Sequence, residues 1–250
     1  MINYNYKINN EDLPMELNKT KWHKHDAKVF IDYLQTFRRT DDKCKWEQNI
    51  INTNYQCLGI LTKNIKAITK EIAKGNYLSF LDLQIYDNFP AITIMGNLIC
   101  KIKNFEIQKH YLDMYSKKVD NWSNCDQLKF LINKDNQDKY LELIEEYIKS
   151  PLTFRRRIAL ITLFKFINPE QISIVFQYSN SLFSEQEYYV NMANAWLLCE
   201  CFIKCKNETL EFLKTHNLNT FTINKMISKC RDSFRISKED KELLKQCHKK

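Results

Sequence analysis

The scarcity of glycine is the feature that most constrains the fold of this chain. Ordinary usage of about 7% would place about 17 glycines in a chain of this length, but its 250 residues contain 3 glycines and 4 prolines. Gly59, Gly75 and Gly96 are too few for the tight turns that sandwiches, barrels and doubly wound α/β folds require. Neither a Gly-x-Gly-x-x-Gly nor a Walker sequence occurs, so the folds that cradle nucleotides with such loops are excluded.

Helical periodicity runs along nearly the whole sequence, and sustained two-residue alternation is almost missing. This pattern predicts an all-α chain of about a dozen helices. Helix-start signals occur at Ser150 and Asn168, where a polar residue precedes a proline, and at Ser184 and Ser237, which have capping-box spacing. In the second half we therefore expect helices over residues 151–166, 169–178, 185–204, 208–215, 222–234 and 238–247.

A short helix followed by a longer one recurs when the sequence is shifted by about 35 residues. The shift places residues 154–159 near residues 188–193, and the next step falls near residues 222–226. This repetition predicts an α-solenoid of HEAT-like antiparallel helix pairs; an irregular helical bundle is the alternative. Because no Pro/Gly-rich linker interrupts the chain, we expect a single domain over residues 21–250, after a loosely ordered, asparagine-rich arm over residues 1–20.

The charge balance favours a polyanionic partner. Lys and Arg number 38 against 30 Asp and Glu, which gives a formal net charge of +8. Since stacked repeats form a long concave face, nucleic acid is the favoured ligand, and a peptide-binding solenoid scaffold is the alternative. The first ten residues are polar, no apolar run approaches the length of a membrane span, and the nine cysteines form no Cys-x-x-Cys pair; we therefore expect a cytoplasmic protein with reduced thiols.

Trp122 and Asp126 form the most informative pair in the sequence. On a helix that starts near Asn121 they are four residues apart and share one face. An aromatic ring beside a carboxylate can hold a cation, because the ring face attracts positive charge and the carboxylate neutralises it. A core tryptophan next to a solvated aspartate is the alternative interpretation.

Three consecutive arginines, Arg155, Arg156 and Arg157, stand out in a chain whose cations are mostly lysine. Arginine suits planar, bidentate recognition of phosphate or carboxylate. Consecutive helix positions point about 100° apart, so one or two of the three at most can face the same ligand. No metal site is expected, since the cysteines between residues 199 and 205 have no histidine close in sequence and are better explained as buried thiols.

Four blocks of the sequence resemble the bacterial DNA alkylation repair enzymes of the AlkD type. They lie in the family's order and with compatible spacing within residues 58–244: residues 119–126, the helix carrying Arg157, residues 188–196 and residues 224–244. The resemblance implies HEAT-like repeats that hold duplex DNA in a basic concave groove and hydrolyse the N-glycosidic bond of cationic alkylated purines. It implies no cofactor and a protein that can work as a monomer. The sequence departs from the family pattern near its start, where Lys66 replaces an arginine.

The resemblance also implies which residues act. The family's essential aspartate falls on Asp126, its neighbouring active-site tryptophan on Trp122 and its active-site arginine on Arg157. Asp126 would stabilise the oxocarbenium-like sugar that forms as the base departs. A member that only binds damaged or branched DNA is the alternative. The residues expected to bind DNA are Trp196, Arg156, Lys225 and Arg231.

Overall fold

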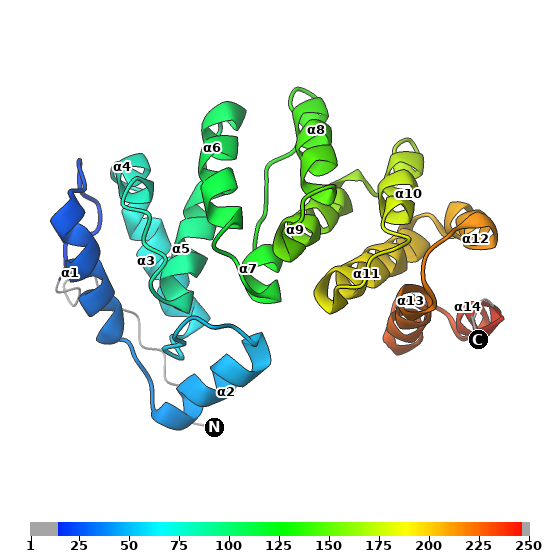
Figure 1. Cartoon of the computed structure of the whole chain (residues 1–250), viewed down its shortest axis with the longest axis horizontal. Coiled ribbons are helices and arrows are strands. Elements are labelled where there is room, and N and C mark those ends of the chain that lie inside the picture. The colour runs from blue at the N-terminus through cyan, green and yellow to red at the C-terminus, as the bar shows by residue number, and fades with distance from the viewer. Residues whose placement is uncertain (1–14, 247–250) are drawn as a thin grey trace. The chain divides into compact units, whose positions relative to one another are not determined.

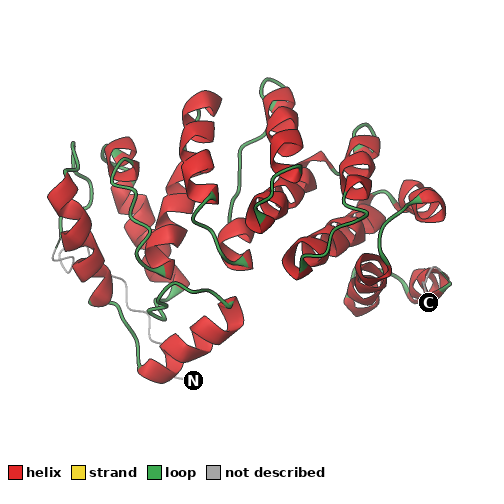
Figure 2. Ribbon diagram, viewed as in Figure 1, coloured by secondary structure: helices red, strands yellow, loops and turns green. Residues whose placement is uncertain are grey.

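A computed structural model describes residues 15–246 and shows an all-α chain (Figures 1 and 2). Within this range there are fourteen α-helices, the 3-10 helix η2 and no strand, and one isolated bridge pairs Gln56 with Asn88. The predicted all-α solenoid is confirmed. In chain order the helices are α1 (Lys24–Gln35), α2 (Asp41–Ile51), α3 (Thr62–Ile72), α4 (Tyr77–Leu81), α5 (Phe89–Ile99), α6 (Phe105–Ser116), α7 (Trp122–Asp126), α8 (Gln137–Ile148), α9 (Thr153–Leu163), η2 (Phe164–Phe166), α10 (Ile172–Ser181), α11 (Tyr188–Lys204), α12 (Lys206–Thr215), α13 (Thr220–Asp232) and α14 (Lys238–Lys245).

The chain divides into two compact units, Met1–Ile102 and Lys103–Lys250. In the first unit α5 packs against α1, α3 and α4. Its core includes three rings in edge-on contact, with Trp22 and Phe30 4.8 and 4.9 Å from Phe80 between ring centroids. The single domain expected over residues 21–250 stays a prediction.

The expected N-terminal arm is partly anchored to the first unit. Residues 1–14 lie outside the described range, but Met15 and Leu17 are buried. The carbonyl oxygen of Lys19 accepts a hydrogen bond of 2.8 Å from the Asn76 amide. A Cβ at Gly75 would lie 2.4 Å from the backbone of Asn18, so this close approach requires glycine. The loose attachment expected for residues 1–20 therefore does not hold for residues 15–20.

The second unit is built from α6 to α14, and its longer helices pack in sequence. Helix α11 packs against both α9 and α13, while α8 covers α9 and α12 covers α11 (Figure 1). Buried side chains between α11 and α13, among them Phe202, Ile223 and Met226, form a continuous core. Helices α9 and α11 run in the same direction, because Arg157 meets Tyr189 and, seven residues later on each, Phe164 meets Trp196.

Three of the predicted helix starts, at residues 151, 169 and 185, are too early, and the first two of them are prolines. Helix α9 begins at Thr153 and α10 at Ile172, so neither proline occupies a first helical position. The Ser150 hydroxyl accepts a hydrogen bond from the Leu152 amide, and the Asn168 side chain accepts from the amides of the second and third residues after it. These polar residues stabilise turns that precede the helices.

Capping-box spacing predicted helix starts after Ser184 and Ser237, and the second of these predictions is confirmed. Ser237 caps α14, and its hydroxyl accepts a hydrogen bond of 3.1 Å from the Asp240 amide. Ser184 does not cap α11, because Glu187 is the N-cap of that helix. Among residues 15–246, no helix combines the length and the apolar character needed to cross a bilayer.

Candidate functional site

Helix α7 is a single turn that fixes the position of Asp126. It begins where the sequence predicted, after Asn121, whose side chain accepts a hydrogen bond of 3.0 Å from the Asn124 amide. The Tyr115 hydroxyl, from α6, donates to the carbonyl oxygen of Asn124 at 2.9 Å. The turn is therefore capped by Asn121 and anchored to α6 by Tyr115, and Asp126 is its last residue.

Asp126 and Arg157 form a bidentate ion pair between α7 and α9. Arg157 Nε donates to Asp126 Oδ1 at 2.9 Å and Nη2 donates to Oδ2 at 2.8 Å, while Nη1 donates to the carbonyl oxygen of Tyr189 at 2.5 Å. The Arg157 side chain is 6% exposed and that of Asp126 is 17% exposed. The guanidinium is thus hidden among the helices, and the carboxylate is the member of the pair that solvent reaches.

The thiol of Cys125 lies beside this pair, and it also links α7 to α9. Its Sγ donates to the carbonyl oxygens of Asn121 and Phe154 at 3.5 and 3.6 Å. Complete burial raises the pKa of this thiol well above its usual value, although the positive charge of Arg157 acts in the opposite direction. Cys125 therefore stays a neutral thiol at physiological pH.

The three consecutive arginines have different partners, as their angular spacing requires. Arg155 bonds to Asp113 and Ser116 of α6, and its guanidinium lies 4.7 Å from the centroid of the Tyr147 ring. Arg156 makes a bidentate pair with Glu185, which precedes α11. Of the three, Arg157 is the one that the structure brings to Asp126. Arg156 as a DNA contact stays a prediction, but its guanidinium is occupied by Glu185 and by the Ser150 carbonyl.

Glu185 belongs to a polar cluster that sequence analysis missed. Its carbonyl oxygen accepts hydrogen bonds from the side-chain amides of Asn191 on α11 and Asn219, each at 3.1 Å. Asn219 is the N-cap of α13 and also donates to Asn191 Oδ1. Together with the Arg156 pair, these bonds tie the first turns of α9, α11 and α13 together. Periodicity gave no sign of this cluster, since Asn219 lies 28 residues from Asn191 and 34 from Glu185.

The two tryptophans lie on different helices, Trp122 on α7 and Trp196 on α11. Trp122 begins α7 and is half-buried, one helical turn before Asp126. Trp196 is half-buried on α11, and its ring packs edge-on against Phe164 at 4.6 Å. Because Trp196 follows Tyr189 by seven residues, it lies about 10 Å further along the helix axis.

The remaining expected DNA contacts lie on α13. Lys225 is exposed, and its Nζ lies 5.7 Å from the centroid of the Phe221 ring. Arg231 is also exposed, with Nε 3.1 Å from Asp232 Oδ1 and Nη2 3.2 Å from the Ser228 hydroxyl. Neither residue has a recorded bond to the Asp126–Arg157 pair.

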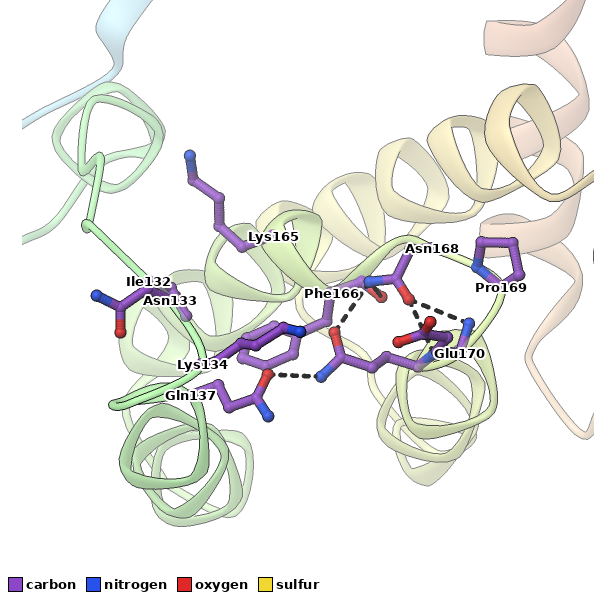
Figure 3. A pocket seen from close by; sticks show the side chains of 10 residues that line it. Ile132, Asn133, Lys134, Gln137, Lys165, Phe166, Asn168, Pro169 and Glu170 are labelled. Carbon is purple, nitrogen blue, oxygen red and sulfur yellow. Dashed lines mark hydrogen bonds between the residues drawn. The ribbon is translucent and has the colours of Figure 1, made fainter.

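A separate pocket of about 710 Å³ lies beyond the C-terminal end of α9 (Figure 3). Its lining comes from the segment before α8 with the first residue of that helix, and from η2 with the segment that follows it; none of the predicted site residues belongs to it. Gln171 joins Gln137 and Asn168 by hydrogen bonds of 3.0 and 2.9 Å across it. The pocket is open and carries Lys134 and Lys165 together with Glu170, so it has no strong preference for either sign of charge.

In the part of the chain that the structure describes, no three His, Cys, Asp or Glu side chains gather as ligands for a metal ion. Cys199, Cys201 and Cys205 are all buried thiols.

Comparison with known proteins places this arrangement in a family. No curated protein sequence matches the chain significantly. Residues 33–229 match the family described as DNA alkylation repair enzyme, and this segment contains Trp122, Asp126, Arg157 and Trp196. The match supports a role in DNA repair with DNA as the partner. Covering most of the sequence, it shows that the chain belongs to the DNA alkylation repair enzyme family.

Proposed function

We propose that this protein is a DNA glycosylase that hydrolyses the N-glycosidic bond of cationic alkylated purines, such as N3- and N7-alkylpurines, in duplex DNA. The observation that supports this best is the Asp126 carboxylate, held by both of its oxygens on Arg157 and reached by solvent while the arginine is not. Membership of the DNA alkylation repair enzyme family supports DNA as the partner, and the carboxylate supports the proposed chemistry.

The alkylated base already carries a positive charge, so it leaves with its bonding electrons and needs no acid to protonate it. The deoxyribose that remains develops oxocarbenium character, and a fixed carboxylate stabilises such a cation most effectively when it requires no reorganisation. Asp126 meets this condition, because Arg157 and the one-turn helix α7 determine its orientation. A water molecule oriented by the same carboxylate then adds to C1′ of the sugar, and its proton passes to bulk water.

Arg157 acts in this proposal mainly as a positioning residue. Three of its five N–H groups are used by Asp126 and the Tyr189 carbonyl. Its burial favours a role in holding the carboxylate over direct contact with a phosphate. Trp122, one turn before Asp126, would pack on the deoxyribose of the lesion. Trp196, about 10 Å beyond Tyr189 along α11, would contact the DNA backbone.

The test is the release of methylated purine from alkylated duplex DNA by the wild-type protein and by Asp126→Asn. We expect wild-type protein to release base and the variant to be slower by at least about 100-fold, because the amide is isosteric but uncharged. Binding of DNA at the same salt concentration should be retained, which separates catalysis from affinity.

Asp113→Asn is the matched control. Asp113 also pairs with an arginine of α9, yet it lies in a different contact and should be dispensable for base release. Wild-type protein that binds DNA without releasing any base would overturn the proposal in favour of a DNA-binding member of the family. Equal losses in the two variants would show that Asp126 acts only on stability.

A further inference from the structure

A series of aromatic side chains leads from the candidate site across the first turns of α9, α11 and α13. The ring of Phe154 lies 5.6 Å from that of Tyr189, which lies 5.3 Å from Tyr188. Tyr188 in turn lies 5.9 Å from Phe221 on α13. We call these four residues the aromatic stripe. It adjoins the Asp126–Arg157 pair, because the Tyr189 carbonyl oxygen accepts the third hydrogen bond of Arg157.

The far end of the aromatic stripe is accessible. Tyr188 is 54% exposed and Phe221 is 39% exposed. Contiguous exposed rings of this kind are unusual on a surface with no apolar partner and often mark an interaction site. Lys225 holds its ammonium group against Phe221, so a cation accompanies the rings at the α13 end of the stripe.

The polar cluster around Glu185 makes the stripe rigid. Asn191, three residues after Tyr188, accepts hydrogen bonds from Asn219 Nδ2 at 3.1 Å and from the Thr222 hydroxyl at 2.8 Å. Thr222 follows Phe221 directly. The backbones that carry the two exposed rings are therefore fixed relative to each other, and binding needs little further ordering of the protein.

We propose that the aromatic stripe binds unpaired nucleotides next to the lesion by stacking on their bases. This inference rests on the proposed function in one respect, because that function places the lesion at Asp126. A duplex presents sugars, phosphates and base edges, whereas an unpaired base offers an aromatic face, and exposed rings beside a cation suit such faces. Glu187, which is exposed and precedes Tyr188, would repel phosphates at this point, so contact through neutral base faces is favoured over backbone contact.

The experiment compares the affinity of the full chain for an undamaged blunt duplex and for the same duplex with a single-stranded tail of about six nucleotides, 5′ or 3′. Fluorescence anisotropy at one salt concentration gives both dissociation constants. We expect one tailed duplex to bind about tenfold more tightly than the blunt one, since stacking of one or two bases contributes on that order. In Tyr188→Ala and Phe221→Ala this gain should be lost, while affinity for the blunt duplex stays unchanged.

Phe234→Ala is the matched control, because Phe234 is a fully exposed aromatic residue outside the stripe, and it should keep the gain. Thermal unfolding of each variant checks that the fold is retained. Equal wild-type affinity for tailed and blunt duplexes would overturn the inference, as would variants that weaken both ligands equally. These measurements use undamaged DNA. Tighter binding of the tailed duplex therefore supports the inference even if the protein releases no base, and base release supports the proposed function even if the tail adds no affinity.

Discussion

Two aspartate–arginine pairs on the same helix have opposite surroundings. Arg155 and Arg157 of α9 each bind an aspartate through the guanidinium. Arg155 binds Asp113 of α6, and Arg157 binds Asp126 of α7. Asp113 also accepts hydrogen bonds from Lys109 and from the Tyr147 hydroxyl, at 2.8 and 2.7 Å. In the described part of the chain, the side chain that bonds to the Asp126 carboxylate is that of Arg157 alone.

The comparison separates a structural ion pair from one that can do chemistry. Asp113 accepts hydrogen bonds from two cations and a hydroxyl, so most of its acceptor sites are occupied although its side chain is 29% exposed. Asp126 has one cation and keeps acceptor capacity toward solvent. Both pairs join an aspartate to an arginine of α9, and they differ in the number of side chains that donate hydrogen bonds to the aspartate. Because removing one member of a pair leaves the other uncompensated, the two arginines should also differ in what their loss does.

The largest effect is expected for Arg157→Ala. The variant leaves Asp126 without its bonded partner, and we expect the free energy of unfolding to fall by about 3 kcal/mol. Base release should fall by about 100-fold even at temperatures where the variant is folded, because the carboxylate loses its orientation. Chemical denaturation and single-turnover base release measure the two quantities.

Arg157→Lys separates the two contributions. Lysine keeps the charge but cannot make the bidentate bond, so it should recover more of the stability than of the activity. Full recovery of base release by lysine would show that orientation by the guanidinium is not needed.

Arg155→Ala should have a smaller and purely structural effect. Asp113 keeps Lys109 and Tyr147 as partners, so the expected loss in the free energy of unfolding is about 2 kcal/mol, part of it from the cation–π contact with the Tyr147 ring. Base release per folded molecule should not change. A loss of activity comparable to that of Arg157→Ala would remove the distinction between the pairs.

The pH dependence of stability should report on Asp113. Burial alone would raise the pKa of this carboxyl, but hydrogen bonds from Lys109 and Tyr147 and the charges of Lys109 and Arg155 outweigh it and hold the pKa below the ordinary value of 3.8. A lowered pKa in the folded state contributes stability above the unfolded pKa, and this stability is lost as the pH falls through the folded value.

The measurement is the difference in unfolding free energy between wild-type protein and Asp113→Asn. It should be constant above about pH 5 and shrink as the pH falls below about 4. A difference that grows on acidification would contradict the assignment.

The smallest effect on stability is expected for Arg231→Ala. Arg231 is paired with Asp232 on the surface, and such pairs contribute less than about 0.5 kcal/mol. If Arg231 contacts a DNA phosphate, the slope of log affinity against log salt should decrease by about one unit. Lys245→Ala, which removes a cation paired with Glu242 on α14, is the control, and an unchanged slope in Arg231→Ala would remove Arg231 from the DNA contacts.

Local signals account for the parts of the fold that could be predicted from sequence. The start of α7 after Asn121 and of α14 after Ser237 depends on hydrogen bonds within three residues, and a short window contains all that is needed. The prediction failed at Pro151 and Pro169, because a proline that suits a first helical turn suits the turn before it equally well.

Contacts between distant segments could not be predicted in this way. The sequence places three arginines side by side but does not say that Arg156 meets Glu185 and Arg155 meets Asp113. These partners, 29 and 42 residues apart, are set by the packing of elements that are distant in the sequence. The pairing of Asp126 with Arg157 belongs to the same class, and the family resemblance, rather than periodicity or spacing, brought those two residues together.

The burial of Cys125 has a consequence for survival under the conditions in which such a protein is needed. Electrophiles that methylate purines also attack thiolates, and a reactive cysteine next to Asp126 would be modified during the stress itself. Here the sulfur is enclosed, donates its hydrogen to two carbonyl groups and has a raised pKa, so it is a poor nucleophile. The centre is thereby shielded from the same reagents whose damage to DNA it would remove.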